Sequence, residues 1–169
     1  MSKHALSGAL GAAVLALAAP AGALAQDQFD ARLNGFQEVP SVSTTASGQF
    51  TAQVSADGTT IEYELNYSGF GAPIAAAHVH FGRRGANGGV IAFLCGGGGK
   101  PDCPAQGPVT GTIDATAVVG PQDQGIAPGE IAELVRALRA GAVYANVHTS
   151  SFPDGEIRGQ VSAQLFDLD

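Results

Sequence analysis

Basic residues are scarce in this sequence. Eight Lys and Arg stand against fifteen Asp and Glu, which gives the 169 residues a formal net charge of −7. A surface with this excess of negative charge repels phosphate backbones and anionic lipid headgroups. Nucleic acids and membrane surfaces are therefore not expected as partners of this protein.

A hydrophobic run long enough to span a membrane is also missing. The uncharged run Leu6–Leu17 is rich in Ala and Gly and falls short of the ~20 strongly apolar residues that a spanning helix needs. It follows Lys3 and precedes the small-x-small triplet Ala23-Leu24-Ala25, an order typical of a secretory signal peptide; a membrane anchor is the alternative. We therefore expect residues 1–25 to be a signal peptide and residues 26–169 to be one exported domain, either periplasmic or secreted.

Cysteine is limited to Cys95 and Cys103, which are separated by a segment rich in Gly and Pro. In an oxidising compartment, such a pair is most simply a disulfide that closes a small loop. A cysteine-ligated metal site is the alternative, but the CxxC spacing of such sites is absent. The sequence therefore predicts a Cys95–Cys103 disulfide.

The motifs of several enzyme classes are lacking. No nucleophile elbow accompanies a Ser-His-Asp order, so hydrolase chemistry has no support. The glycine run Gly96–Gly99 is followed by Lys100-Pro101 and not by Lys-Ser or Lys-Thr, and no helix is expected to begin there. This run is therefore not a phosphate-binding loop.

Glycine, in contrast, is abundant, with 24 residues that cluster between short runs of alternating apolar and polar side chains. Alternation over 29–34, 50–55 and 61–67 predicts strands, and the Asp57-Gly58 turn joins the last two as a hairpin. Further strands are expected at 75–81, 89–94, 108–114, 142–148 and 156–165. About eight short strands separated by turn residues predict an all-β fold, either a two-sheet sandwich or a closed barrel.

One segment has helical periodicity instead. Apolar residues recur at helical spacing at Ile131, Leu134, Val135 and Leu138, with acidic residues in the first turn and basic residues in the last turn. This charge order complements the helix dipole, and a glycine directly after the segment can cap its end. We expect a single short helix over 129–140 that packs on one end of the sheet.

Three histidines remain once the signal peptide is removed, and their spacing is informative. His78 and His80 are two residues apart on an expected strand, so both side chains point from the same face with Cα atoms about 6.5–7 Å apart. His148 lies on another expected strand, on the same face as Tyr144 and Asn146. If these two strands are neighbours, three imidazoles can meet at one copper or zinc ion. The alternative is that each histidine is satisfied by a carbonyl or carboxylate and that no ion is bound.

Two charged residues near the end of the chain can contribute to such a site. Glu156 and Arg158 are two residues apart and can share one face of the last strand. One interpretation is an ion pair at the surface, which stabilises a fold by at most about 1 kcal/mol. The other is that these residues surround the metal and that Arg158 attracts a small anion towards it.

The histidines fall within two blocks of sequence that resemble the CHRD family, named after chordin. The first block is AHVHFG at 77–82, followed by GANG at 85–88; the second is GAVYANVHT at 141–149, followed by FPDGEIRGQ at 152–160. The segment LNGFQEVP at 33–40 is similar to the family's first strand and turn. The resemblance covers roughly residues 29–163.

The resemblance implies an immunoglobulin-like β-sandwich with limited similarity to copper–zinc superoxide dismutases. It implies no particular activity, because the family has no settled biochemical function. A two-metal enzyme of the dismutase type is excluded, because the three histidines after the signal peptide cannot supply both of its sites. We expect a non-catalytic exported binding module with a mononuclear metal site and an extracellular or cell-surface protein as a partner. The alternatives are a mononuclear copper redox enzyme acting on a small anion such as superoxide, and a metal-free interaction module.

Overall fold

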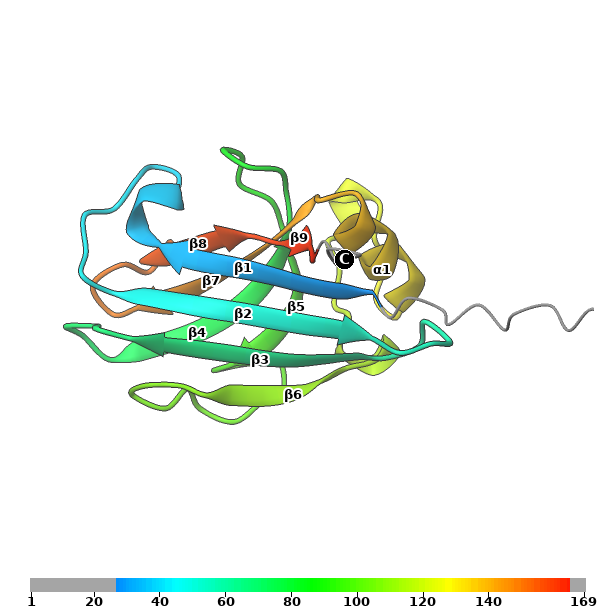
Figure 1. The fold of residues 1–169 in the computed structure, drawn as a ribbon, viewed down its shortest axis with the longest axis horizontal. Coiled ribbons are helices and arrows are strands. Elements are labelled where there is room, and N and C mark those ends of the chain that lie inside the picture. The colour runs from blue at the N-terminus through cyan, green and yellow to red at the C-terminus, as the bar shows by residue number, and fades with distance from the viewer. Residues whose placement is uncertain (1–26, 165–169) are drawn as a thin grey trace, which may run out of the picture.

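Nine strands form one antiparallel, nearly closed sheet in the computed structural model, which describes residues 27–164 (Figure 1). The strands are β1 Gln28–Asn34, β2 Ser47–Val54, β3 Ile61–Ser68, β4 Ile74–Phe81, β5 Val90–Cys95, β6 Val109–Ile113, β7 Val143–Thr149, β8 Ile157–Gln160 and β9 Ser162–Ala163. Their order across the sheet is β5-β4-β7-β8-β1-β2-β3-β6, and β9 pairs with β1. The expected all-β sandwich is confirmed.

The sheet folds over so that two layers face each other. In Figure 1, β1, β2, β3 and β6 form the near layer, and β4, β5, β7 and β8 lie behind them. The strands at the two ends of the sheet, β5 and β6, lie against each other without pairing. The sheet therefore has one open seam and a single core between its layers.

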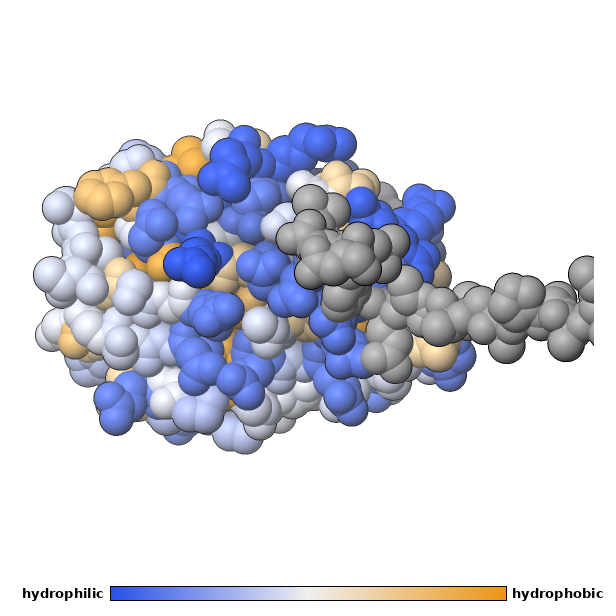
Figure 2. Space-filling view, viewed as in Figure 1, coloured by the Kyte–Doolittle hydropathy of each residue, from blue (hydrophilic) through white to orange (hydrophobic). Residues whose placement is uncertain are grey.

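Alternation along the strands determines which side chains enter the core. Every second residue of β3 is buried, from Ile61 to Tyr67, and the residues between them are exposed. Hydrophilic residues cover much of the outer face of β1, β2 and β3 (Figure 2). The opposite layer supplies its own buried apolar residues to the core, among them Val79 of β4 and Val147 of β7. Period-two alternation thus produces a core in the middle of the sandwich.

The last expected strand, 156–165, is interrupted. Val161 lies between β8 and β9, is fully buried, and donates its N–H to the carbonyl of Val143. β8 pairs with both β7 and β1, whereas β9 pairs with β1. Pairing with β7 ends at Val161, and the result is two short strands where alternation alone predicts one.

The single α-helix, α1 Ile131–Arg139, packs at one end of the sandwich (Figure 1). Leu134, Val135 and Leu138 are buried as expected, and Ile131 is half-buried. The helix begins two residues later than expected because Gly129 has a φ of +90°, which is outside the helical region. Gly141, with a φ of +61°, stands in the left-handed conformation common just beyond a helix end. Short 3₁₀ turns occur at η1 Gly35–Gln37, η2 Ala115–Ala117 and η3 Gln122–Gln124.

Cys95, the last residue of β5, forms a disulfide with Cys103, as expected. The bridge closes the glycine-rich segment between the two cysteines. Among the residues that the structure describes, no helix is long and apolar enough to cross a membrane.

Candidate metal centre

Strands β4 and β7 are direct neighbours, which is the arrangement that the histidine pattern requires. In their antiparallel register, His78 lies opposite Asn146, His80 opposite Tyr144, and Ala76 opposite His148. Val79, between the two β4 histidines, is buried in the core, and so are Ala145 and Val147 on either side of Asn146. Because side chains alternate along a strand, the histidines lie on the outer face of this layer. All three imidazoles therefore project from one side of one pair of strands.

The three imidazoles converge. One ring nitrogen of each of His78, His80 and His148 lies within 4.8 Å of those of the other two. The ring centroids of His78 and His148 are 4.8 Å apart, and His78 Nδ1 lies 3.1 Å from His148 Nε2. Within the described part of the chain, this is the one group of three or more His, Cys, Asp or Glu side chains that could hold a metal ion.

Two backbone carbonyls determine which nitrogens are free to bind. His80 Nδ1 lies 2.9 Å from the carbonyl oxygen of Gly88, and His148 Nδ1 lies 2.8 Å from that of Pro153. A carbonyl oxygen can only accept, so each Nδ1 carries the hydrogen and donates it. Each Nε2 of the neutral rings then has a lone pair directed towards the cluster. This is the orientation that hydrogen bonds around a metal site give to its histidine ligands.

Burial keeps the histidines uncharged. It lowers the pKa of His78 to about 3, helped by the neighbouring His148 and His80, and lowers the pKa of His80 to about 4. The pKa of His148 is also lowered by burial. At neutral pH the rings are therefore in the form that binds metal ions.

Two lone pairs in this cluster have no hydrogen-bond donor. His78 Nε2 and His80 Nε2 are both buried and have no partner among the described residues. Asn146 Oδ1 lies 3.1 Å from His148 Nε2, and in the tautomer assigned above both of these atoms are acceptors. Reversing the amide of Asn146 would satisfy that one contact, but it would leave the buried Nε2 of His78 without a partner. Buried acceptors facing one another indicate a place for a cation.

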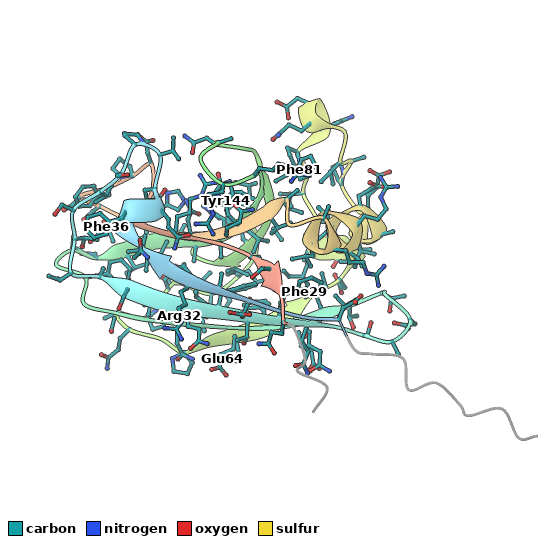
Figure 3. The ribbon with its side chains drawn as sticks, turned by 45° about the horizontal axis from the view of Figure 1, so that its top comes forward. Phe29, Arg32, Phe36, Glu64, Phe81 and Tyr144 are labelled. Atoms are coloured by element: carbon teal, nitrogen blue, oxygen red, sulfur yellow. A yellow bond between two sulfur atoms is a disulfide. The ribbon has the colours of Figure 1, made fainter. Side chains whose placement is uncertain are left out.

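A stack of three planar groups supports His80. The His80 ring lies on the Tyr144 ring, with centroids 4.7 Å apart and planes inclined by 5°. The guanidinium of Arg158 lies over the Tyr144 ring, with Cζ 3.4 Å from the ring centroid. Figure 3 shows Tyr144 between the segment that follows β1 and the loop that follows β4. The Tyr144 ring therefore packs directly on one of the three histidines.

Arg158 is buried, with 1% of its surface exposed. Its terminal nitrogens donate to Asn87 Oδ1 at 3.2 Å and to the carbonyls of Arg83 and Ala86 at 3.1 and 2.8 Å. These contacts hold the loop whose next residue, Gly88, accepts from His80. The side chain therefore holds this loop in place, and it does not form the surface ion pair that was one of the two interpretations of the sequence.

Glu156 is buried as well, but it points to other partners. Its carboxylate accepts from Thr44 Oγ1 at 2.7 Å and from Thr149 Oγ1 at 2.6 Å. No ion pair joins Glu156 to Arg158 in residues 27–164. Glu156 therefore joins the segment after β1 to the end of β7, and the structure does not bring it to the histidines.

Sequence reasoning missed Glu38, another buried acid near the site. Its side chain is 6% exposed, and Oε1 has no hydrogen-bond partner among the described residues. Burial raises its pKa to about 7, although the charge of Arg158 opposes that rise. A Cβ on Gly155 would lie 2.6 Å from Glu38 Oε1 and 3.0 Å from Asn146 Nδ2, so both side chains lie against this glycine. The position of Glu38 in the motif at 33–40 is the one signal that could have indicated it.

The carbonyl groups of Gly88 and Pro153 were also missed, although both residues fall within the quoted sequence blocks. A backbone oxygen has no side-chain signature, so only the loop conformation reveals it. Phe93 was missed for a different reason. It lies on β5 directly opposite His78, a pairing that appears only with the register of the strands.

A comparison with protein families identifies the family that the two sequence blocks resemble. The family model of the CHRD domain matches residues 29–161. A comparison with curated proteins and one with solved structures each returned no match.

Proposed function

The chain belongs to the CHRD domain family, and on that premise we propose that it is an exported, non-catalytic binding module that holds one copper or zinc ion. The ligands are His78, His80 and His148. Tyr144, Asn146 and Arg158 position them, and Glu156 holds the neighbouring strand end. An extracellular or cell-surface protein is the proposed macromolecular partner.

The observation that carries this proposal is the convergence of three neutral imidazoles, two of which have a buried Nε2 without a hydrogen-bond partner among the described residues. An unpaired buried acceptor costs roughly 1–3 kcal/mol, so two of them at His78 and His80 are an expensive arrangement without a ligand. A metal ion would satisfy both at once. Imidazole nitrogen suits zinc and copper alike, and three protein ligands leave a position for water or another molecule.

Metal binding needs only small side-chain movements. Metal–nitrogen bonds of about 2.0–2.1 Å place ligand nitrogens roughly 3.3–3.6 Å apart. One ring nitrogen from each of the three histidines already lies within 4.8 Å of the other two. Rotation of the imidazoles about their side-chain bonds covers the difference.

Export is supported by the disulfide and by the first residues of the sequence. Cys95–Cys103 is a bridge of the kind that persists in oxidising compartments such as the periplasm or the extracellular space. The proposed signal peptide, residues 1–25, lies outside the described residues. The cellular location is therefore proposed from the sequence pattern together with the disulfide.

The test is metal analysis of the mature protein, expressed in the periplasm with its own leader and purified with both metals supplied. One equivalent of copper or zinc per chain is the expected result. A folded protein that stays metal-free after exposure to both ions contradicts the site and favours a metal-free interaction module. A superoxide-dismutation assay of the copper-loaded form then separates a binding module from a copper redox enzyme.

A further inference from the structure

The glycine run Gly96–Gly99, which fits no phosphate-binding loop, forms the end of a small hairpin. Gly96 N–H donates to the Pro101 carbonyl at 2.8 Å, and Lys100 N–H donates to the Gly97 carbonyl at 2.9 Å. The two central residues, Gly98 and Gly99, have φ values of +57° and +79°, as in a type I′ turn. The Cys95–Cys103 disulfide closes the base of this hairpin.

The hairpin rests on one aromatic ring. A Cβ on Gly97 would lie 2.8 Å from Phe93 Cε1, and a Cβ on Gly98 would lie 2.5 Å from Phe93 Cδ2. Such distances are too short for real carbon atoms, so the backbone of these glycines packs directly against the ring. Gly99, in contrast, has no atom within 4 Å of its Cβ position.

Phe93 in turn packs on a proposed metal ligand. It is the cross-strand partner of His78 in the β4–β5 pair. The two ring centroids are 4.6 Å apart and the planes are inclined by 89°, an edge-to-face contact. The His78 ring therefore lies between Phe93 on one side and His148 on the other.

We propose that the disulfide-closed hairpin holds His78 in its metal-binding position through Phe93, so that metal affinity depends on the disulfide. This inference rests on the metal site proposed above. Phe93 is a positioning residue, because it contacts a ligand and not the ion. Since coupling between two sites is reciprocal, a bound ion must stabilise the hairpin as much as the hairpin favours binding.

Two alanine variants of the same turn make the test. Gly98→Ala and Gly99→Ala introduce the same strain, a side chain at positive φ, but only the first places its Cβ against Phe93. We expect Gly98→Ala to weaken zinc binding about tenfold or more, the range seen when groups that orient metal ligands are lost. Gly99→Ala should stay within about twofold of the wild type, since its side chain meets nothing. Competition with a chromophoric chelator measures both affinities.

A second pair of variants tests Phe93 itself. Phe93→Leu removes the ring contact with His78, and Phe70→Leu is the matched control, since Phe70 is a partly buried ring that packs on Tyr67. Phe93→Leu should alter the electron paramagnetic resonance spectrum of the copper-loaded protein. Phe93→Tyr should keep the wild-type spectrum, and so should Phe70→Leu.

The disulfide is tested by the double variant Cys95→Ser/Cys103→Ser. It should bind zinc more weakly than the wild type, as Gly98→Ala should.

The outcomes distinguish this inference from the proposed function. If the wild type binds no zinc or copper, the proposed function fails and this inference fails with it. If the wild type binds zinc and the two alanine variants bind equally well, only the inference fails. Nuclear magnetic resonance of metal-free protein gives an independent reading. Gly98→Ala should shift the imidazole signals of His78, and unchanged signals would overturn the inference.

Discussion

One ring nitrogen from each of His78, His80 and His148 points to a common centre, so each histidine should be needed for metal binding. A ligand that binds the folded state raises stability by roughly 2.7 kcal/mol at a hundredfold excess over its Kd. We expect the wild type to show this metal-linked rise in melting temperature, and His78→Ala, His80→Ala and His148→Ala each to lose most of it. Differential scanning calorimetry with and without zinc measures the effect.

The control for the histidine series is Asn66→Ala, an exposed residue of β3 on the opposite layer. It should keep the full metal-linked rise. A His148→Ala variant that binds zinc as tightly as the wild type would rule out the three-histidine site.

Burial of Glu38 should make the stability of the folded protein depend on pH. Its pKa rises from 4.5 to about 7 on folding because of burial. The folded state therefore binds more protons than the unfolded state between these values, and stability falls as pH rises from about 4.5 to 7. Glu38→Gln removes this penalty, so the variant should exceed the wild type by up to about 3 kcal/mol at pH 8.

The Glu38→Gln experiment compares urea unfolding of the two proteins at pH 4 and pH 8. At pH 4 the wild-type carboxyl is protonated in both states, so the two stabilities should be nearly equal. A difference of the same size at both pH values would mean that the charge of Glu38 is not the cause.

Among the loops, the turn after β4 depends on a single buried side chain. Arg158 donates to three oxygens of residues 83–87 and lies over Tyr144. Lysine keeps the charge but cannot provide the planar fork or the stacking. We expect Arg158→Lys to lower the free energy of unfolding by about 2–4 kcal/mol, because the buried side chain loses its hydrogen bonds to this loop and its stacking on Tyr144.

The control for Arg158→Lys is the same substitution at Arg32, an exposed residue on the outer face of β1. Its effect on chemical denaturation should stay below about 0.5 kcal/mol. Equal losses from the two variants would show that Arg158 acts through its charge and not through its fork of hydrogen bonds.

At the element scale, helix α1 depends on its buried face for attachment to the sandwich. Leu134 is 1% exposed, so Leu134→Ala should cost about 2–4 kcal/mol as a buried truncation. Arg136, whose side chain is 73% exposed, pairs with Glu133 at the surface, and Arg136→Ala should cost less than about 0.5 kcal/mol. Thermal unfolding of both variants tests this orientation of the helix. Similar losses of stability would contradict a helix with Leu134 buried and Arg136 exposed.

For the whole molecule, we predict that the mature protein begins at Gln26 and carries one disulfide. Intact mass spectrometry after periplasmic expression should give the mass of residues 26–169 less two hydrogens, and reduction followed by alkylation should add two labels. Retention of residues 1–25 would contradict the signal peptide, and two free thiols before reduction would contradict the bridge.

The fold class follows from local patterns in the chain. Side chains alternate along a strand with a period of two, so the runs at 29–34 and 61–67 show which faces are buried without reference to any other strand. The same rule puts His78 and His80 on one face. Helix α1 and the disulfide are local too, because each depends on residues close together in the chain.

Contacts between distant segments could not be predicted in the same way. Which strands pair depends on the free energy of the whole packed core, and no spacing within one strand encodes it. The sequence therefore left open whether β4 adjoins β7, and with it whether His148 meets His78. It also left open whether Arg158 is at the surface, because the loop that contacts this side chain lies far away in the sequence.

The sequence by itself determined the alternating faces, the helix, the cysteine bridge and the residue types that can bind a metal. Each of these depends on covalent geometry and on near neighbours. The tertiary structure decided that three histidines converge, that two backbone carbonyls orient them, and that Glu38 and Arg158 are buried beside them. Those outcomes required the sheet to fold over and the loops to close, because burial and hydrogen bonding at the site are properties of surfaces brought together from across the chain.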